Sequence, residues 1–184
     1  MKKNSILPLA IGTLLGFPIV GFIIHYFLFE TSFILLFVSK SNLPIELVIG
    51  SITGLGFGYL AWYIISMPFM SPVLNKYRNL ICTFDLDLPH IFFVSFCAGF
   101  GEEILFRGVL QPHLGVWVTA IIFVAIHGYL NPNNWRITVY GIYLTIAIGI
   151  IGYLTQYFGL ITAIIAHMMI DVILFYKLTK KLAS

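Results

Sequence analysis

Charged side chains are scarce in this sequence. Ten Lys and Arg and seven Asp and Glu make up only 9% of its 184 residues, whereas soluble globular domains carry about 25%. This scarcity excludes an ordinary soluble enzyme. Lys and Arg beside membrane helices account for the formal net charge of +3, so that charge does not indicate a nucleic-acid partner.

Cysteine and long polar segments are also nearly absent. The two cysteines, Cys82 and Cys97, lack the spacing of a zinc cluster and are too few for a disulfide framework. No polar stretch is long enough to fold as a second domain. We therefore expect a single membrane domain over residues 1–184.

Apolar residues dominate the chain instead. They form 60% of it, and the mean hydropathy is +1.00, which predicts an integral membrane protein. Crossing a hydrocarbon core of about 30 Å takes about 20 apolar residues in a helix. Runs near that length predict an all-α fold, a polytopic transmembrane helix bundle of about six spans at residues 7–29, 44–66, 90–110, 113–130, 137–158 and 160–178.

The segments between and before these spans need separate interpretations. The basic start and apolar run at the N-terminus resemble a signal peptide, but the run can span a bilayer and lacks a small-x-small cleavage site, which favours a retained first helix. The run at 33–39 is too short to cross. Residues 66–79 and 131–136 carry turn-forming residues and are expected to be breaks.

The distribution of basic residues predicts the orientation. Cytoplasmic loops collect Lys and Arg, and with six spans only Lys40 falls in an external loop. We therefore expect a multi-pass protein of a bacterial plasma membrane with both termini in the cytoplasm. The residues expected on the cytoplasmic side are Lys2, Lys3, Lys76, Arg78, Arg136, Lys177, Lys180 and Lys181.

Three charges stand together inside the third expected span, in the sequence GEEILFRG at 101–108. A charge within a bilayer costs at least a few kcal/mol and is usually functional. Glu103 and Arg107 are four residues apart, so on a helix they can pair. Glu102 is rotated by about 100° from Glu103, which leaves it as the carboxylate that is free for chemistry.

Two further spans carry ionisable residues at helical spacing. Phe123 and His127 share one face of the fourth span, and His167 and Asp171 share one face of the sixth. Each histidine alone could be a structural residue. Polar groups on three separate apolar helices need one another or water, so together they predict a shared functional cavity.

The patterns EExxxR, FxxxH and HxxxD, read here as EEILFR, FVAIH and HMMID, occur in that order. Over residues 90–175 this resembles the CPBP family of intramembrane proteases, also called the CAAX protease and bacteriocin-processing or Abi family. Its eukaryotic member is the Ras-converting CAAX endopeptidase. Members carry Asn or Asp at the last motif position, so Asp171 is a variant. The resemblance implies an endopeptidase acting on a membrane-associated peptide or protein, and prenylated CAAX substrates are the family's best-known case.

The same residues support a chemical account of peptide hydrolysis. Glu102 and His127 are expected to activate water, while His167, held by Asp171, stabilises the developing oxyanion. Glu103 and Arg107 are expected to support Glu102. A metal-assisted alternative stays open, because Glu102, His127 and His167 are an adequate ligand set for Zn²⁺. An ionised Asp171 would repel an oxyanion, so it must be protonated, act through His167 or ligate a cation.

Two other functions fit the residues less fully. A transporter or proton relay also needs ionisable groups within helices, but no repeated half is visible. A catalytically silent bacteriocin-immunity or membrane scaffold protein would use the same cavity to bind a partner. Glu46, Trp135 and Arg136 are interpreted as interface anchors rather than site residues.

Overall fold

A computed structural model describes residues 6–180, and every regular element in that range is helical. The all-α fold class is confirmed. Five helices are long and apolar enough to cross a membrane. They are α1 (Leu7–Leu28), α2 (Leu43–Ile65), the continuous segment Leu88–Leu114, α7 (Trp135–Phe158) and α8 (Leu160–Thr179).

The segment Leu88–Leu114 comprises three helical pieces, namely α4 (Leu88–Glu103), the π-helix η4 (Ile104–Leu110) and α5 (Gln111–Leu114). The remaining elements are shorter. The expected short run at 33–39 forms the 3-10 helix η2 (Phe33–Phe37), and a second one, η3 (Pro68–Met70), precedes α3 (Ser71–Cys82).

The fourth expected span, at 113–130, is shorter than predicted. Its helix, α6 (Val116–Ile126), has 11 residues and is therefore only about 16 Å long. Turn-forming residues Gly128, Asn131 and Pro132 follow it, so the chain continues as a loop to Asn134 rather than as helix.

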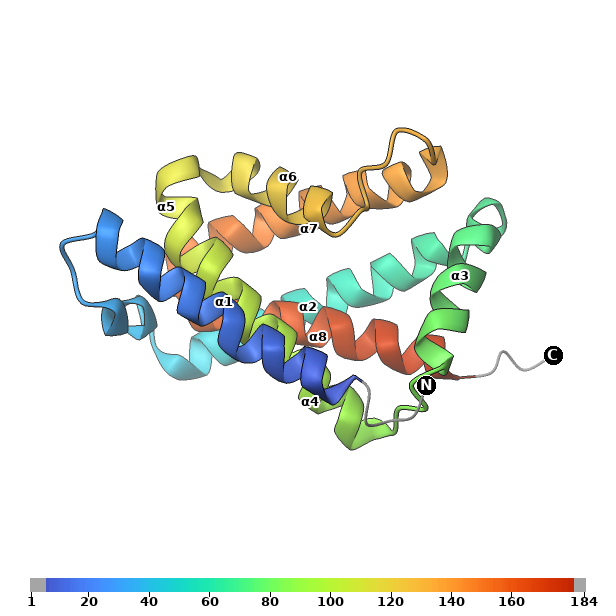
Figure 1. Cartoon of the computed structure of the whole chain (residues 1–184), viewed down its shortest axis with the longest axis horizontal. Coiled ribbons are helices and arrows are strands. Elements are labelled where there is room, and N and C mark those ends of the chain that lie inside the picture. The colour runs from blue at the N-terminus through green and yellow to red at the C-terminus, as the bar shows by residue number, and fades with distance from the viewer. Residues whose placement is uncertain (1–5, 181–184) are drawn as a thin grey trace.

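The long elements nevertheless run back and forth along one axis. In Figure 1, α1, α2, α4, α6, α7 and α8 alternate in direction, with the loop after α6 completing that pass. As a result, the beginning of α1 and the end of α8 lie at the same end of the molecule. The start of α7 and helix α3 lie at this end too (Figure 1).

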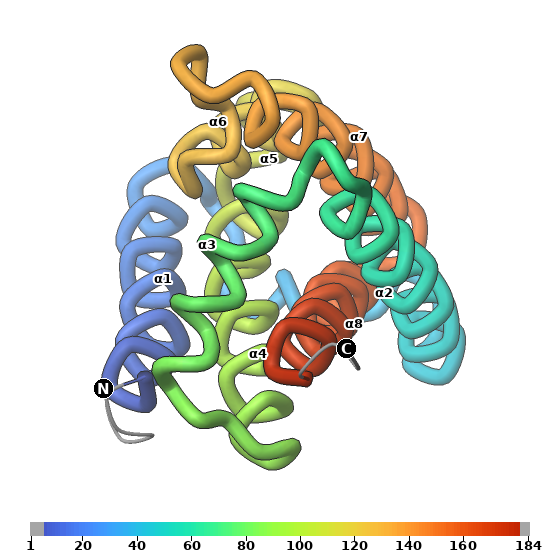
Figure 2. Tube along the Cα trace, turned by 90° about the vertical axis from the view of Figure 1, so that its right-hand side faces the viewer, coloured from blue at the N-terminus to red at the C-terminus, as the bar shows by residue number. Residues whose placement is uncertain are grey.

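The segment 66–79, expected as a break, contains helix α3. Pro72 occupies the first turn, where its missing N–H costs nothing. Val73, Leu74 and Ile81 are buried on one face, at the spacing of an amphipathic helix. Figure 2 shows α3 crossing the end of the bundle between α2 and α4.

Helix α8 packs closely against α2. Gly50, Gly54 and Gly58 recur every four residues along the buried face of α2, as small residues do where membrane helices approach closely. A Cβ added at Gly54 would lie 2.4 Å from the carbonyl oxygen of Ala166. The glycine face therefore fixes the position of the helix that carries His167 and Asp171.

Glu46 is not the interface anchor that the sequence suggested. Its side chain is fully buried, and Oε2 accepts a hydrogen bond from the backbone N–H of Thr162, at 3.3 Å. Thr162 lies in the first turn of α8, where backbone N–H groups have no helical partner and favour a negative charge. Glu46 thus stabilises the start of α8.

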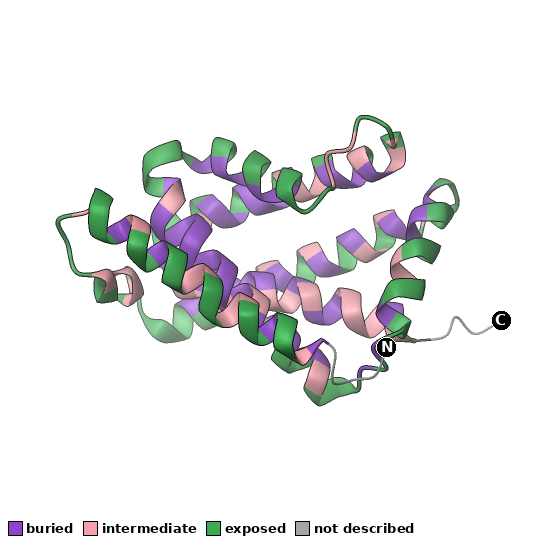
Figure 3. Cartoon of the chain, in the orientation of Figure 1, coloured by how far each residue is buried: buried purple, intermediate pink, exposed green. Residues whose placement is uncertain are grey.

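Many large apolar residues lie on the outer surface. Exposed large hydrophobic residues cover much of α1, including Leu9, Ile19 and Phe27, and Figure 3 shows exposed positions along its outer side. Soluble monomers rarely expose such wide apolar patches. With the five long apolar helices, this surface supports an integral membrane protein.

Candidate active site

Helix α4 brings two buried carboxylates to the middle of the molecule. Glu102 and Glu103 are its last residues, and the chain then widens into η4. Such π-helical turns often occur at functional sites. Arg107, inside η4, places Nε 3.0 Å from Oε2 of Glu103, with both side chains almost fully buried. The expected ion pair is therefore present.

Helix α8 approaches α4 at Gly99, one turn before these carboxylates. A Cβ at Gly99 would lie 2.8 Å from the carbonyl oxygen of Ile164, so only glycine permits this distance between the helices. The approach brings Nδ1 of His167 to 2.8 Å from Oε1 of Glu103. Because Glu103 is paired with Arg107, its carboxylate accepts and Nδ1–H of His167 donates.

This contact differs from the sequence interpretation, in which Asp171 holds His167. Oδ2 of Asp171 lies 3.7 Å from Nε2 of His167, which is too long for a direct hydrogen bond. Glu103 is therefore the residue that orients the His167 ring, and Asp171 faces the opposite ring nitrogen. The sequence predicted that Glu103 pairs with Arg107 and supports Glu102, with a direct contribution to the site left open, but not its hydrogen bond to His167.

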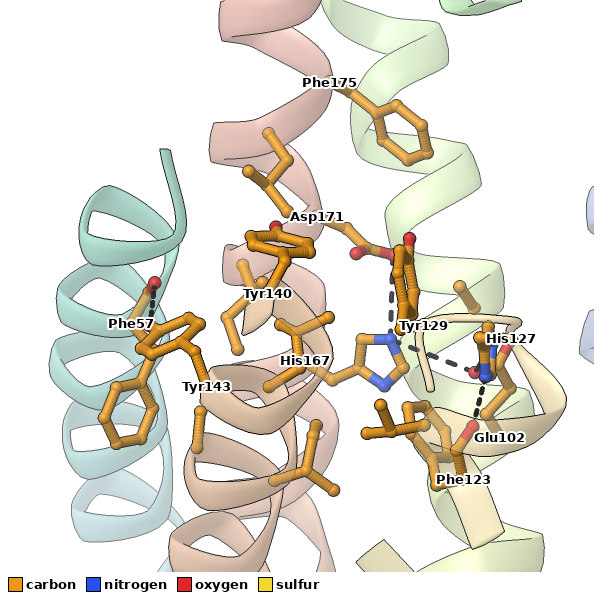
Figure 4. A pocket seen from close by; sticks show the side chains of 17 residues that line it. Phe57, Glu102, Phe123, His127, Tyr129, Tyr140, Tyr143, His167, Asp171 and Phe175 are labelled. Carbon is orange, nitrogen blue, oxygen red and sulfur yellow. Dashed lines mark hydrogen bonds and ion pairs between the residues drawn. The ribbon is translucent and has the colours of Figure 1, made fainter. Parts of the chain in front are cut away.

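His127 reaches the same carboxylates from α6. It directly follows the last residue of that helix, and Nδ1 donates to the carbonyl oxygen of Phe123, at 2.6 Å. Nε2 lies 3.5 Å from Oε2 of Glu102, and Nε2 of His167 lies 4.0 Å from the same oxygen. Figure 4 shows Glu102, His127, His167 and Asp171 facing one another.

The tautomers determine what this cluster can do. Both Nδ1 atoms donate to oxygen acceptors, so both neutral rings present an Nε2 lone pair toward Glu102. Oε2 of Glu102 is buried and has no hydrogen-bond donor among the described residues. Such a set of acceptors needs a shared proton or a bridging water to be stable. Proton transfer is therefore the chemistry that it favours.

Phe123 organises the histidines and the arginine around one ring. Its centroid lies 4.5 Å from that of His127 and 5.6 Å from that of His167. The Arg107 guanidinium carbon lies 4.7 Å from the ring centroid on its face, a cation–π geometry. Phe123 therefore fixes three polar side chains through packing.

The cluster opens into a cavity of about 280 Å³ between α4, α6, α7 and α8. The His127 side chain is 32% exposed, against 11% for Glu102 and 9% for His167, so the cluster is most open beside His127. Sequence reasoning missed the aromatic side chains of its wall, because nothing in their spacing marks them. These are Phe57, Tyr129, Tyr140, Tyr143 and Phe175.

One of these tyrosines joins two helices across the cavity. The hydroxyl of Tyr143 in α7 donates to the backbone carbonyl oxygen of Phe57 in α2, at 2.7 Å (Figure 4). Elsewhere the wall is aliphatic, with Leu144, Ala147, Ile148 and Ile170. Most of the lining is thus apolar or aromatic, while Glu102, His127, His167 and Asp171 supply its ionisable groups.

The donor types of Glu102, His127 and His167 suit zinc, and each histidine uses Nδ1 in a second hydrogen bond, as ligand histidines do. Within residues 6–180, however, no group of three or more His, Cys, Asp or Glu side chains is arranged to hold a metal ion.

Comparison with known proteins points to the same segment. Residues 84–173 match the model of a family described as type II CAAX prenyl endopeptidase Rce1-like. The uncharacterised protein YpbD of Bacillus subtilis (strain 168) is 38% identical over 88 residues, which cover 47% of this chain but only 44% of YpbD. No solved structure matches. The matched segment contains Glu102, Glu103, Arg107, His127, His167 and Asp171.

Proposed function

We propose that this chain is an intramembrane endopeptidase, because residues 84–173 match the Rce1-like family of type II CAAX prenyl endopeptidases. The observation that carries the proposal is the convergence of Glu102, His127 and His167, from three helices, on one cavity. The family supports a protease in general terms; the substrate and the roles of individual residues are our proposal.

The first step is attack by water on the peptide carbonyl carbon. Glu102, acting with His127, takes a proton from the water as the new C–O bond forms. Their separation of 3.5 Å between Nε2 and Oε2 lets one water contact both groups. The stored proton is then delivered to the leaving nitrogen as the C–N bond breaks, which regenerates both side chains.

The second requirement is a donor for the oxyanion. His167 supplies Nε2–H when its ring is protonated, and the buried Glu103 carboxylate at Nδ1 stabilises that imidazolium. Arg107 in turn holds Glu103 ionised and in place. A preoriented donor in a buried site is worth about 2.7–4 kcal/mol of transition-state stabilisation.

Asp171 contributes through His167 in this mechanism. An ionised carboxylate would repel the oxyanion, but at 3.7 Å from Nε2 of His167 it favours the protonated ring. When protonated, it would itself be a hydrogen-bond donor facing the cavity. The ionised state thus supports the protonated imidazole of His167, and the protonated state offers a donor to the cavity.

The proposed substrate is a membrane-associated peptide or lipidated protein, with the prenylated CAAX type as one candidate. A peptide held in a membrane can reach an apolar cavity without passing through bulk water. Helix α3 and the ends of α7 and α8 carry Lys76, Arg78, Arg136, Lys177 and Lys180 at one end of the molecule. We propose that this end faces the cytoplasm at a bacterial plasma membrane.

Cleavage of membrane-tethered peptides tests the proposal directly. Purified protein is given prenylated and unprenylated peptides, and products are identified by mass spectrometry. Glu102→Gln keeps the shape of the side chain but removes the base, so we expect kcat to fall by at least about 100-fold. Glu30→Gln, at an exposed position distant from the site, is the matched control and is expected to retain full activity.

Two outcomes of this experiment distinguish the proposed mechanism from the metal-assisted mechanism and from a protein without catalytic activity. A general base needs no metal, so we expect activity to persist in a chelator; loss restored by Zn²⁺ would instead assign Glu102, His127 and His167 as ligands. Folded wild-type protein that cleaves nothing in the panel would contradict the protease and favour a silent immunity or scaffold protein.

A further inference from the structure

A second cavity of about 220 Å³ lies beside the catalytic one, toward the basic end of the molecule. Helix α3 forms its roof through Tyr77, Leu80 and Ile81, and Ile65 and Leu178 close its other sides. We call it the α3 chamber. Its boundary with the catalytic cavity consists of residues that line both, namely Tyr129, Tyr140, Asp171, Leu174 and Phe175.

Tyr129 forms the partition between the two spaces. Its ring lies parallel to that of His127, with centroids 6.3 Å apart, and edge-on to Tyr140 at 5.7 Å. It also packs against the ring of Tyr77 on α3, with centroids 6.0 Å apart. Figure 4 shows the Tyr129 ring between His127 and Asp171. A single side chain therefore connects a proton-transfer residue to the roof of the chamber.

The sizes of the two spaces indicate one divided site. Pockets that enclose a small ligand measure about 300–1,000 Å³. Neither the catalytic cavity nor the α3 chamber reaches that range alone, but together they fall within it. Because they share a wall and adjoin the same catalytic cluster, one ligand molecule with parts in both fits the arrangement better than two unrelated ligands.

The chamber also has a defined distance from the reacting groups. Along α8 the lining residues run from His167 through Asp171 to Leu178, a rise of about 16 Å. An extended peptide covers that length with about five residues. A substrate whose scissile bond lies at Glu102 and His127 therefore reaches the chamber with a side chain close to that bond.

We propose that the α3 chamber is the specificity subsite of this enzyme, and that it takes one large apolar side chain of the substrate peptide. This rests on the proposed endopeptidase function. The occupant is apolar because Ile65, Leu80, Ile81 and Leu178 line the chamber, with Asp171 only at its border. Residues of α3, outside the matched catalytic helices, would thus decide which peptides are cleaved.

Leu80 offers a direct test because it lines the chamber while half of its surface is exposed, so changes there leave the core intact. Leu80→Trp shrinks the chamber and Leu80→Ala enlarges it. Asn79→Trp and Asn79→Ala, at the neighbouring exposed position that does not line the chamber, are the matched controls. The measurement is kcat/KM over peptides that carry Ala, Leu, Phe or Trp at each position within five residues of the cleaved bond.

We expect wild type to prefer a large apolar residue over Ala at one position by about tenfold, the range that a hydrophobic pocket supplies. Leu80→Trp should abolish this preference while the Ala peptide stays within twofold of wild type. Leu80→Ala should shift the preference toward Phe or Trp, and both Asn79 variants should behave as wild type.

The failures are distinguishable. Wild type that cleaves no peptide overturns the proposed function itself. Wild type that cleaves, with a preference that Leu80→Trp and Leu80→Ala leave unchanged, overturns only the subsite. If Leu80→Trp lowers kcat/KM equally for the Ala peptide and for the large-residue peptides, the subsite is also overturned. Such a result would mean that the substitution damages the enzyme as a whole and does not change which side chain it prefers.

Discussion

Glu103 and Asp171 are both within reach of His167, and their contacts differ in kind. Glu103 is fully buried, paired with Arg107 and hydrogen-bonded to Nδ1 at 2.8 Å. Asp171 is 23% exposed and lies 3.7 Å from Nε2. An acceptor at Nδ1 fixes the tautomer and orientation of the ring, the task that the buried aspartate performs in Ser-His-Asp triads. The structure gives this task to Glu103.

Paired amide substitutions test this assignment. We expect Glu103→Gln to lower kcat by at least about 100-fold with little change in KM, because His167 loses the charge that supports its protonated ring. Asp171→Asn, the same change at the other carboxylate, should cost less than about tenfold. Cleavage assays with both purified variants decide the matter. A larger loss in Asp171→Asn would return the orienting role to Asp171.

At the scale of elements, the site depends on how closely α4 and α8 approach. His167 reaches Glu103 only because Gly99 allows the backbone of α8 to lie against α4, and the glycine face of α2 holds α8 from the other side. The π-helical turn after Glu103 then directs Arg107 back to the same carboxylate. Short distances within the cluster are thus a property of helix packing.

Adding one methyl group at Gly99 should therefore disturb the chemistry. In Gly99→Ala the Cβ meets the Ile164 carbonyl oxygen at 2.8 Å, so the helices must separate, at a cost of about 1–3 kcal/mol in stability. We expect cleavage to fall at least tenfold as His167 moves from Glu103. The matched control is Gly56→Ala on α2, where nothing lies within 4 Å.

The control variant Gly56→Ala should gain about 0.5–1 kcal/mol in free energy of unfolding, since alanine is a better helix former than glycine. Thermal unfolding in detergent measures both variants, and the cleavage assay measures activity. If Gly99→Ala has the same unfolding temperature and the same cleavage rate as wild type, α4 and α8 can separate without consequence. The close packing of the two helices would then not be required for activity.

At the scale of the whole molecule, periodicity and composition predicted the helical fold and the residues of the cluster. The bilayer requires long apolar runs, and charged residues inside such runs are easily recognised in any membrane sequence. The partner of each charge could not be predicted in this way, because the Glu103–His167 contact depends on tertiary packing. Helix α3 was missed because Pro72, Asn75 and Asn79 suggest turns, although Val73, Leu74, Tyr77 and Ile81 have helical spacing.

The pass from α5 to α7 is the least expected part of the molecule. Helix α6 covers only about half of a hydrocarbon core of about 30 Å, and the loop 127–134 completes the pass (Figure 1). Irregular backbone at membrane depth is tolerated where it lines a cavity or is buried in protein. His127 and Tyr129 of this loop line the same cavity as Glu102 and His167, which fits this tolerance.

If this pass crosses the membrane, Asn133 lies on the same side as Cys82 and opposite to Lys40. Cys82 is exposed at the end of α3, whereas Cys97 is buried, so Cys82 reports the basic end. Lys40→Cys and Asn133→Cys, each made with Cys82→Ser, place single accessible thiols at the other positions. We expect a membrane-impermeant maleimide to label Lys40→Cys in intact cells, and Cys82 and Asn133→Cys only in inside-out vesicles. Labelling of Asn133→Cys together with Lys40→Cys would mean that α6 and its loop return to the side they started from, so that this pass does not cross the membrane.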